Sequence, residues 1–332
     1  MIAVLGASGF IGTYLVDELI KEGKEVLACG RNENAKTYYE KNNIIFEKVD
    51  IACKNDFDRL KKYDIDSVVL LAALLPANVK EDNVYNYINT NVIGTVNTLE
   101  FCRKNDVETI IFTTTYADVQ NKWSDVEPIT EETIRDYKYT GDHSVYVFSK
   151  NMATDLIKHY SDKYGLRGVV FRLPPVYGVG PHSCIYVDGK KYVSGFQIFI
   201  EKAMAGEEIE IYGDHNIFRD VVYVKDVVRG IILAIDNINT KGLYNMGSGV
   251  KLTLKKQVED IVEMFSPLDN KSKIIYRRDR PNNSKSYVLD ISKAKNDFGY
   301  VPQYADFRKL LEDYKEELRM DRFEHLKKRS IK

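Results

Sequence analysis

The stretch "GASGFIG" places three glycines three positions apart, from Gly6 to Gly12, directly after the apolar run Ile2–Leu5. A helix-period pattern, Phe10–Lys21, follows at once. A strand, a glycine-rich turn and a helix direct backbone N–H groups and the positive helix end at one point, which favours a pyrophosphate. Gly6 permits the tight turn, Gly9 permits close approach of a ligand, and Gly12 lets the helix pack on the strand. This turn therefore predicts a dinucleotide site.

Short apolar runs alternate with amphipathic helical patterns through the first half of the chain. The predicted strands are Ile2–Leu5, Glu25–Ala28, Ile44–Lys48, Ser67–Leu71, Thr109–Thr113 and Gly168–Phe171. The predicted helices are Phe10–Lys21, Lys54–Lys61, Val84–Lys104 and Val145–Lys163. This alternation predicts an α/β fold of the Rossmann type, a doubly wound parallel sheet with helices on both faces.

The regular alternation stops after Pro174, where "IYVDGKKYV" predicts a hairpin around Asp188–Gly189. We expect residues 1–174 to form the dinucleotide-binding domain, rejoined by about residues 220–247. Residues 175–219 and 248–332 are then a smaller, mixed α/β C-terminal lobe that binds the substrate.

Composition excludes several kinds of partner. The chain has 332 residues with 48 basic and 49 acidic side chains, a formal charge of -1, so no general field attracts nucleic acid or an anionic membrane. Its four cysteines contain no C-x-x-C pair, which fits a reducing compartment, and we expect no metal site. Because no basic leader precedes the first strand and no apolar run reaches membrane-spanning length, we expect a cytoplasmic protein.

Two Tyr-x-x-x-Lys pairs occur, Tyr146/Lys150 and Tyr186/Lys190. On a helix this spacing puts phenol and ammonium on one face, where the cation stabilises a phenolate and draws the phenol pKa down from about 10. Tyr186 lies in the predicted hairpin, where that geometry is lost, whereas Tyr146 opens a predicted helix. We therefore expect Tyr146 to be the acid/base.

The motifs together resemble the extended short-chain dehydrogenase/reductases, in particular their nucleotide-sugar epimerase/dehydratase group, from residue 1 to about 302. The residues that carry the resemblance are the glycine turn, "VDI" at Val49–Ile51, "LAA" at Leu71–Ala73, "FTTT" at Phe112–Thr115, "YVFSK" at Tyr146–Lys150, "RLPPVYGVGP" at Arg172–Pro181, "FRDVVYVKDV" at Phe218–Val227 and "LDISKAKNDFGYVP" at Leu289–Pro302. Serine stands at residue 8, where the general dinucleotide fingerprint has a glycine.

The resemblance implies an NAD or NADP cofactor. Its contacts are expected at Gly6, Ser8, Gly9, Phe10, Ile11, Gly12, Arg31, Asp50, Ile51, Ala72, Ala73, Asn91, Thr113, Tyr146, Lys150, Pro174 and Val176. Arg31 stands at the end of the second strand, where a cation accepts a 2′-phosphate, so NADP is favoured over NAD. Arg31 could instead stack on adenine, and Glu33 could still reach the ribose.

The resemblance also implies catalysis by Thr115, Tyr146 and Lys150, with Thr115 and Tyr146 sharing one substrate oxygen. We expect a nucleotide-sugar epimerase that works through a transient keto sugar. The alternatives are an NADPH-dependent keto-sugar reductase and, less favoured, a dehydratase, a reductase of non-sugar carbonyls or a cofactor sensor. Dehydratases of the family carry Asp-Glu after the catalytic threonine, where this chain has Tyr116 and Ala117. Asp118, near Thr115, and His143, near Tyr146, are further candidates for proton transfer.

The remaining expectations concern partners. By resemblance, Arg219 and Arg280 bind the diphosphate of a nucleotide sugar, to which guanidinium is well matched. Helices Val84–Lys104 and Val145–Lys163 are expected to pair with a second copy as a homodimer.

Overall fold

The protein is described from a computed structural model that covers residues 1–76, 83–141, 143–181, 184–187, 190–282, 284–320 and 322–323. Within these residues seven parallel strands form the main sheet, in the order β13-β6-β5-β4-β1-β2-β3. They are β1 (Ile2–Leu5), β2 (Val26–Gly30), β3 (Ile45–Lys48), β4 (Ser67–Leu70), β5 (Thr109–Thr115), β6 (Arg167–Leu173) and β13 (Gly242–Asn245). The predicted doubly wound Rossmann-type sheet is confirmed.

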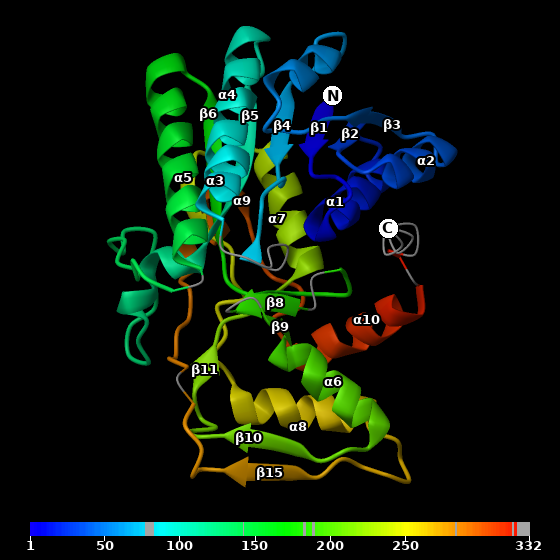
Figure 1. Cartoon of the computed structure of the whole chain (residues 1–332), viewed down its shortest axis with the longest axis vertical. Coiled ribbons are helices and arrows are strands. Elements are labelled where there is room, and N and C mark those ends of the chain that lie inside the picture. The colour runs from blue at the N-terminus through cyan, green and yellow to red at the C-terminus, as the bar shows by residue number, and fades with distance from the viewer. Residues whose placement is uncertain are drawn as a thin grey trace.

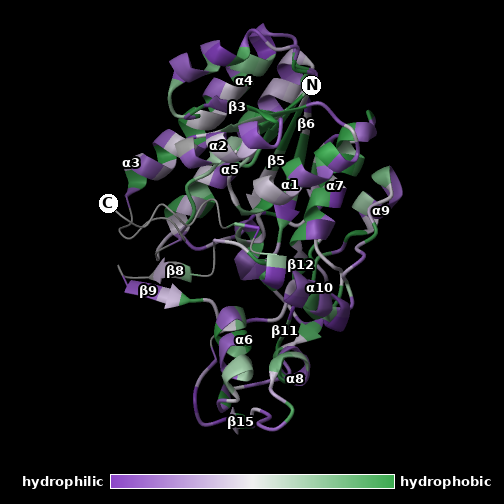
Figure 2. Ribbon diagram, turned by 90° about the vertical axis from the view of Figure 1, so that its right-hand side faces the viewer, coloured by the Kyte–Doolittle hydropathy of each residue, from purple (hydrophilic) through white to green (hydrophobic). Residues whose placement is uncertain are grey.

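Helices cover both faces of this sheet (Figure 1). The elements around it are α1 (Phe10–Lys21), α2 (Glu33–Lys41), η1 (Lys54–Leu60), α3 (Val84–Tyr87), η3 (Ile88–Ile93), α4 (Gly94–Lys104), η4 (Tyr116–Lys122), α5 (Ser144–Tyr164), α7 (Val224–Asp236) and α9 (Ser292–Phe298). Side chains alternate along each strand, so Ile2 and Val4 pack with α1 and α7 while Ala3 and Leu5 pack with α4 and α5. Figure 2 shows hydrophobic strands between helices whose outer faces are hydrophilic.

The sequence-based prediction missed α2. Its residues, "ENAKTYYEK", are mostly polar, and of them Ala35 and Tyr39 are fully buried, one turn apart. Asn32 caps this helix by accepting a hydrogen bond from the backbone N–H of Asn34 at 3.0 Å. A pattern of two apolar contacts is too short to predict a helix without its packing partners.

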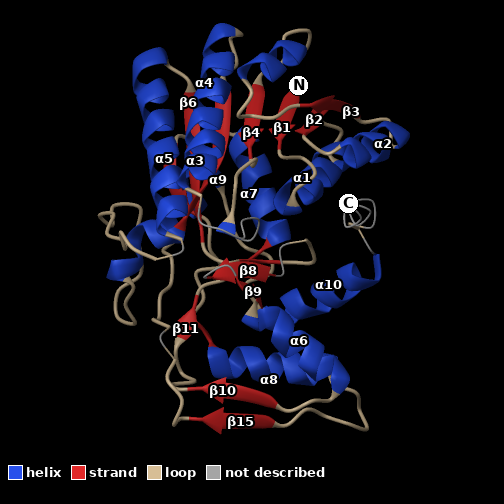
Figure 3. Cartoon of the chain, in the orientation of Figure 1, coloured by secondary structure: helices blue, strands red, loops and turns tan. Residues whose placement is uncertain are grey.

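The remaining elements lie mostly beyond the carboxyl edge of the sheet (Figure 3). Their bounds are β7 (Val176–Tyr177), β8 (Cys184–Val187), β9 (Lys190–Val193), α6 (Gly195–Ala205), β10 (Ile209–Tyr212), β11 (Phe218–Arg219), β12 (Val222–Tyr223), β14 (Leu252–Thr253), α8 (Leu254–Phe265), β15 (Ile274–Arg277) and α10 (Phe307–Met320). They pair as small two-stranded sheets, β10 with β15, β11 with β14, β12 with β7 and β8 with β9. The smaller C-terminal lobe is thus a mixture of helices and short strands, as predicted.

The predicted hairpin is present as the antiparallel pair β8 and β9, although its turn, Asp188–Gly189, lies outside the described residues. Tyr186 and Lys190 therefore lie on paired strands, where they do not share a helical face. Strand β13 returns to the main sheet beside β6, and α7 packs against α1. We propose on this basis the domain division 1–174 with 220–247, and 175–219 with 248–332.

Candidate active site

The glycine turn joins β1 to α1. Gly6 has φ +96°, and a Cβ at Gly6 would lie 2.6 Å from the backbone nitrogen of Ala72. A Cβ on Gly12 would collide with the Gly6 carbonyl oxygen, so this helix can pack on the turn only without a side chain there. Gly9 is the N-cap of α1 and has no side chain to cover the first helical turn. This turn can therefore admit an anionic group against the helix N-terminus.

The end of β2 carries polar groups suited to a nucleoside. The Arg31 side chain is 62% exposed, and its Nη1 lies 3.7 Å from Oδ2 of Asp50. Asn32 is buried, and its Nδ2 has no hydrogen-bond partner among the described residues. A buried amide donor without a partner costs free energy that a ligand oxygen would recover. The glycine turn and this donor set fit a dinucleotide cofactor.

Asn91 holds the loop that follows β4. Its Nδ2 donates to the Leu74 carbonyl oxygen at 3.1 Å and to Oγ of Ser149 at 2.9 Å, while its Oδ1 accepts from the Leu74 N–H at 2.7 Å. The π-helical turn η3 carries Asn91 and allows its buried side chain to reach this loop. The structure therefore places Asn91 as a link between α5 and the loop that contains Ala72 and Ala73.

The other predicted cofactor residues gather at the carboxyl edge of the sheet, where ligands bind in doubly wound folds. Phe10 and Ile11 begin α1, Ser8 lies beside Gly30, Asp50 and Ile51 follow β3, Ala72 and Ala73 follow β4, Thr113 is in β5, Pro174 follows β6, and Val176 is in β7. The topology thus brings together residues from six segments of the chain.

The three predicted catalytic residues come from two packed elements. Thr115 ends β5, and its Oγ1 accepts a hydrogen bond from the Ala117 N–H at 3.2 Å. Tyr146 and Lys150 lie one turn apart on α5, which packs against β5. Lys150 is 3% exposed, and its Nζ lies 3.9 Å from the centre of the Phe112 ring.

Burial dominates the protonation of both groups on α5. It lowers the pKa of the Lys150 ammonium from 10.5 to about 7. Burial also raises the pKa of the Tyr146 phenol, and the nearby phenols of Tyr87 and Tyr116 add to the rise. The prediction that Lys150 lowers the Tyr146 pKa is not met in this structure, because burial is the largest influence on the phenol and raises its pKa.

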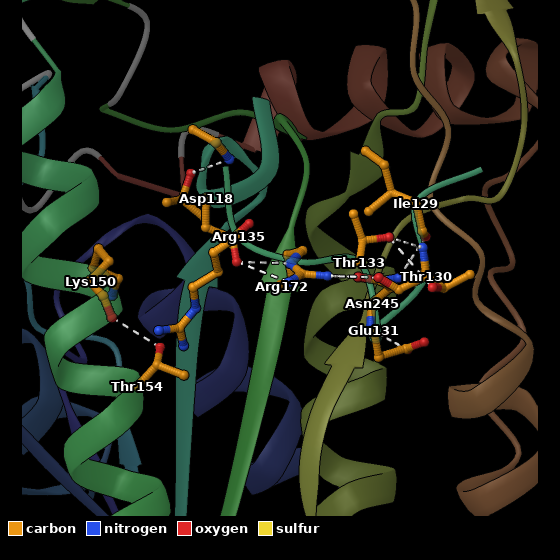
Figure 4. Close-up of polar contacts among 12 residues, drawn as sticks. Asp118, Ile129, Thr130, Glu131, Thr133, Arg135, Lys150, Thr154, Arg172 and Asn245 are labelled. Carbon is orange, nitrogen blue, oxygen red and sulfur yellow. Dashed lines mark hydrogen bonds and ion pairs between the residues drawn. The ribbon is translucent and has the colours of Figure 1, made fainter. Parts of the chain in front are cut away.

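Asp118 forms a buried ion pair that the sequence did not indicate. Arg172 in β6 donates to Oδ2 of Asp118 from Nη2 at 2.9 Å and from Nε at 3.2 Å, and both side chains are at most 2% exposed. Nη1 of Arg172 donates to the Thr130 carbonyl oxygen at 3.0 Å and to Oδ1 of Asn245 at 3.2 Å (Figure 4). Asp118 thus links the turn after Thr115 to the sheet.

His143 occupies the N-cap position of α5, but its side chain makes no capping hydrogen bond. Its Nε2 is buried and has no partner among the described residues. The His143 side chain therefore does not cap α5.

Two arginines of the C-terminal lobe lie on short strands or just after them. Arg219 in β11 donates to Oγ of Ser284. The neighbouring carboxylate of Asp220 is instead buried and accepts from the N–H and Oγ of Ser248 at 2.8 and 2.7 Å. Arg280 follows β15, and its Nη1 donates to the Tyr212 hydroxyl at 3.1 Å. Asp220 therefore does not form an ion pair with Arg219.

A family model described as the NAD dependent epimerase/dehydratase family matches residues 2–247. The chain belongs to this family. It is therefore an enzyme of the NAD-dependent epimerase/dehydratase family, and the resemblance to extended short-chain dehydrogenase/reductases is confirmed. Within the described residues, no helix is both long enough and apolar enough to cross a membrane.

Relatives of this family match almost the whole chain. A protein of Methanocaldococcus jannaschii with the provisional name UDP-glucose 4-epimerase is 31% identical over 308 residues, 91% of this chain and 93% of that protein. The UDP-glucuronate 4-epimerase of Thermodesulfobacterium geofontis is 29% identical over 316 residues, 91% of each chain.

Solved structures of epimerases share the fold. The UDP-glucose 4-epimerase of Thermotoga maritima, solved with UDP-glucose, has a TM-score of 0.79 and 27% identity, covering 96% of this chain and 98% of that one. The UDP-glucose 4-epimerase of Thermus thermophilus, solved with NAD, has a TM-score of 0.73 and 25% identity, covering 95% and 98% of the two chains.

Sequence reasoning missed three residues that shape this epimerase/dehydratase-family site. Arg172 was quoted in a motif but not assigned a contact, and its partner Asp118 is 54 positions away. Asn32 gives no distinct signal in the sequence, because a polar residue after a strand is a common turn residue. Trp123, the only tryptophan of the chain, stacks on Tyr116. The one sequence signal for Trp123 was that it is the only tryptophan of the chain.

Proposed function

We propose that this chain is a nucleotide-sugar epimerase that oxidises a sugar hydroxyl to a transient ketone and reduces the ketone from the opposite face. The observation that carries the proposal is the Tyr146/Lys150 pair on α5 beside Thr115, at the edge of a sheet with a dinucleotide-type glycine turn. Several relatives are named as epimerases, which supports the same proposal.

In this mechanism the ionised form of Tyr146 accepts the proton of the sugar hydroxyl and returns it when the ketone is reduced. Thr115 hydrogen-bonds the same oxygen and keeps it directed at the phenol. Lys150 binds the ribose next to the nicotinamide and stabilises the phenolate when its own ammonium is charged. A nicotinamide dinucleotide bound at the glycine turn would supply the hydride chemistry.

The residues after Thr115 argue against dehydration. Loss of water from a keto sugar requires an acid and a base next to the ketone. Tyr116 is half-buried and stacked on Trp123 at 5.0 Å, and Ala117 has no polar side chain. Asp118, the nearest carboxylate, is held by Arg172 and faces the protein interior.

Arg31 keeps the keto-sugar reductase as a second candidate, because an exposed guanidinium at the end of β2 suits the 2′-phosphate of NADPH. The two functions differ in what they do to the cofactor. An epimerase regenerates it in every cycle, so we expect purified protein to retain oxidised cofactor and to convert a nucleotide sugar without net change at 340 nm. Stoichiometric NADPH consumption would favour the reductase.

The substrate is proposed to be a nucleoside diphosphate sugar whose diphosphate binds Arg219 and Arg280. Asp220 accepts from Ser248 and does not pair with Arg219, whose guanidinium donates to Ser284. Arg280 also lies 3.8 Å from Glu210. Arg219→Ala and Arg280→Ala should each weaken nucleoside-diphosphate binding by about 1.5–3 kcal/mol, the range for a hydrogen bond to a charged group.

Calorimetric titration with UDP, GDP, CDP and dTDP tests this, with binding of the dinucleotide as the control. If none binds the parent protein, or if neither variant weakens the best binder, a small carbonyl substrate becomes the better proposal.

We further propose a homodimer in the cytoplasm. Helices α3, α4 and α5 lie side by side on one face of the sheet (Figure 1). The exposed apolar side chains of this region are Val84 and Tyr85 of α3, Ile93 of η3 and Met152 of α5. Apolar side chains gathered on adjacent helices favour burial against a second copy. Sedimentation at micromolar concentration should give a dimer, and Tyr85→Asp with Met152→Asp should give a monomer.

A further inference from the structure

Arg172 in β6 is the largest fully buried side chain in the described part of the chain. Its Nη2 and Nε donate to Oδ2 of Asp118 in η4 at 2.9 and 3.2 Å. Its Nη1 donates to the Thr130 carbonyl oxygen and to Oδ1 of Asn245 in β13 at 3.0 and 3.2 Å (Figure 4). A buried guanidinium is tolerated only where its donors are paired. These contacts therefore hold η4, the loop that follows it and β13 in one arrangement.

The turn between Thr115 and Asp118 is attached to β6 at both of its ends. Thr115 is the last residue of β5, and its register partner on β6 is Leu173, the neighbour of Arg172. Asp118 is attached to the same strand through its ion pair with Arg172. The Asp118 carbonyl oxygen also accepts from the Asp136 N–H at 3.0 Å. A short turn held at both ends has little freedom to shift, so its polar groups keep fixed positions.

This turn decides how the Thr115 hydroxyl can hydrogen-bond. The Ala117 N–H donates to Oγ1 of Thr115 at 3.2 Å. A threonine hydroxyl has one hydrogen to donate and two positions at which it accepts. The Ala117 contact takes up an accepting position, so the Thr115 hydrogen remains for donation. In the proposed mechanism negative charge develops on the sugar oxygen as it loses its proton, and a directed donor stabilises that charge.

We propose that Asp118 and Arg172 are positioning residues whose ion pair holds the Ala117 N–H against Thr115, so that the Thr115 hydroxyl is kept as a donor for the sugar oxygen. This inference rests on the proposed nucleotide-sugar epimerase. It gives Asp118 a role other than proton transfer, since Oδ2 of Asp118 is taken by Arg172 and its side chain is 2% exposed. The pair acts on the reaction only through Thr115.

The test is a double-mutant cycle on kcat. Its substrate is whichever of UDP-glucose, UDP-N-acetylglucosamine and UDP-glucuronate the parent converts fastest. Asp118→Asn keeps the size of the side chain and an oxygen for Arg172, but it removes the charge. It should lower kcat about 10- to 100-fold, as a small misplacement of a reacting group does. KM should stay within about twofold, because the lost interaction is made only in the transition state.

The second arm of the cycle uses Thr115→Val, which removes the hydroxyl and keeps the shape of the side chain. Loss of one directed donor should lower kcat by about 100-fold or more. Adding Asp118→Asn to Thr115→Val should then cost no more than about twofold, because no hydroxyl is left to position. A merely structural role would give the same fold-loss in both backgrounds, and that result would overturn the proposal.

A further variant separates positioning from folding. Asp118→Ala with Arg172→Met leaves no buried charge unpaired, so its urea unfolding should be close to that of the parent. Its kcat should nevertheless stay at least about tenfold below the parent value, because the turn has lost its attachment. Recovery of kcat together with stability would show that the pair serves folding alone. This variant also carries the test if Asp118→Asn does not fold.

Asp136→Asn is the matched control. The Asp136 carboxylate belongs to the same loop, is 39% exposed, and contacts Asn121 and Lys122 instead of Arg172. The loss of this exposed charge should leave kcat within about twofold.

The outcomes separate this inference from the function on which it rests. Turnover by the parent, with fold-losses for Asp118→Asn and Thr115→Val that multiply, overturns the role of the ion pair and leaves the epimerase intact. No turnover of any of the three nucleotide sugars by the parent overturns both.

Discussion

Lys150 provides a measurable link between stability and pH. Its ammonium is 3% exposed, and burial lowers its pKa from 10.5 to about 7. At 1.36 kcal/mol per pKa unit this shift corresponds to an unfavourable contribution of about 5 kcal/mol when the folded protein must hold a charged Lys150. We therefore expect Lys150→Met to be more stable than the parent at neutral pH while it loses turnover.

The sign of the pH dependence follows from proton binding. Between about pH 7 and pH 10.5 the unfolded chain holds a proton on Lys150 that the folded chain has released, so the stability of the parent rises with pH across this window. Below about pH 7 both states are protonated and the full cost is present. The advantage of Lys150→Met should therefore be largest near pH 6 to 7 and should shrink as the pH approaches 10.

Urea unfolding at a series of pH values, followed by Trp123 fluorescence, measures this difference. Lys158→Met is the matched control, because Lys158 lies on the same helix with its side chain 75% exposed and paired with Asp162. It should change stability by only about 0.5 kcal/mol at any pH. A Lys150→Met variant that is no more stable than the parent at pH 7, or whose advantage does not vary with pH, would contradict the burial cost of Lys150.

Three further predictions concern the site. Tyr146→Phe removes only the ionisable oxygen and should abolish turnover with nearly unchanged cofactor affinity by calorimetry; retention of activity within about tenfold would contradict its role as acid/base. Arg31→Ala should weaken NADP binding by about 1.5–3 kcal/mol and barely affect NAD, whereas equal losses would mean that Arg31 does not bind the 2′-phosphate. Asp118→Ala leaves the buried Arg172 charge unpaired and should cost about 3–5 kcal/mol in urea unfolding, and adding Arg172→Met should restore most of it; a loss below about 1 kcal/mol would contradict the ion pair.

Much of the fold was predictable because its signals are local. β1 and α1 have the predicted bounds, since a short apolar run, a turn that tolerates only glycine at Gly6 and Gly12, and a 3.6-residue period are each contained in about a dozen residues. The Tyr146/Lys150 pair was identified for the same reason, because i and i+4 share a face on any helix. Helix α2 was not predicted, because only two of its residues are buried, and their burial depends on packing against the rest of the fold.

The tertiary structure decided the protonation of Lys150 and Tyr146 and the packing of the side chains around them. Sequence spacing predicted that Lys150 would lower the Tyr146 pKa, but α5 packs against β5, and burial raises the pKa of the phenol and lowers that of the ammonium. The partner of Asp118 and the ring that joins Tyr116 and Trp123 likewise come from distant segments, Arg172 and Tyr287. The sequence by itself determined which residues are proposed for the chemistry, because residue type and helical spacing can be read along the chain. Only the tertiary structure decided their charge and their neighbours, because burial and pairing depend on segments that folding brings together from far apart.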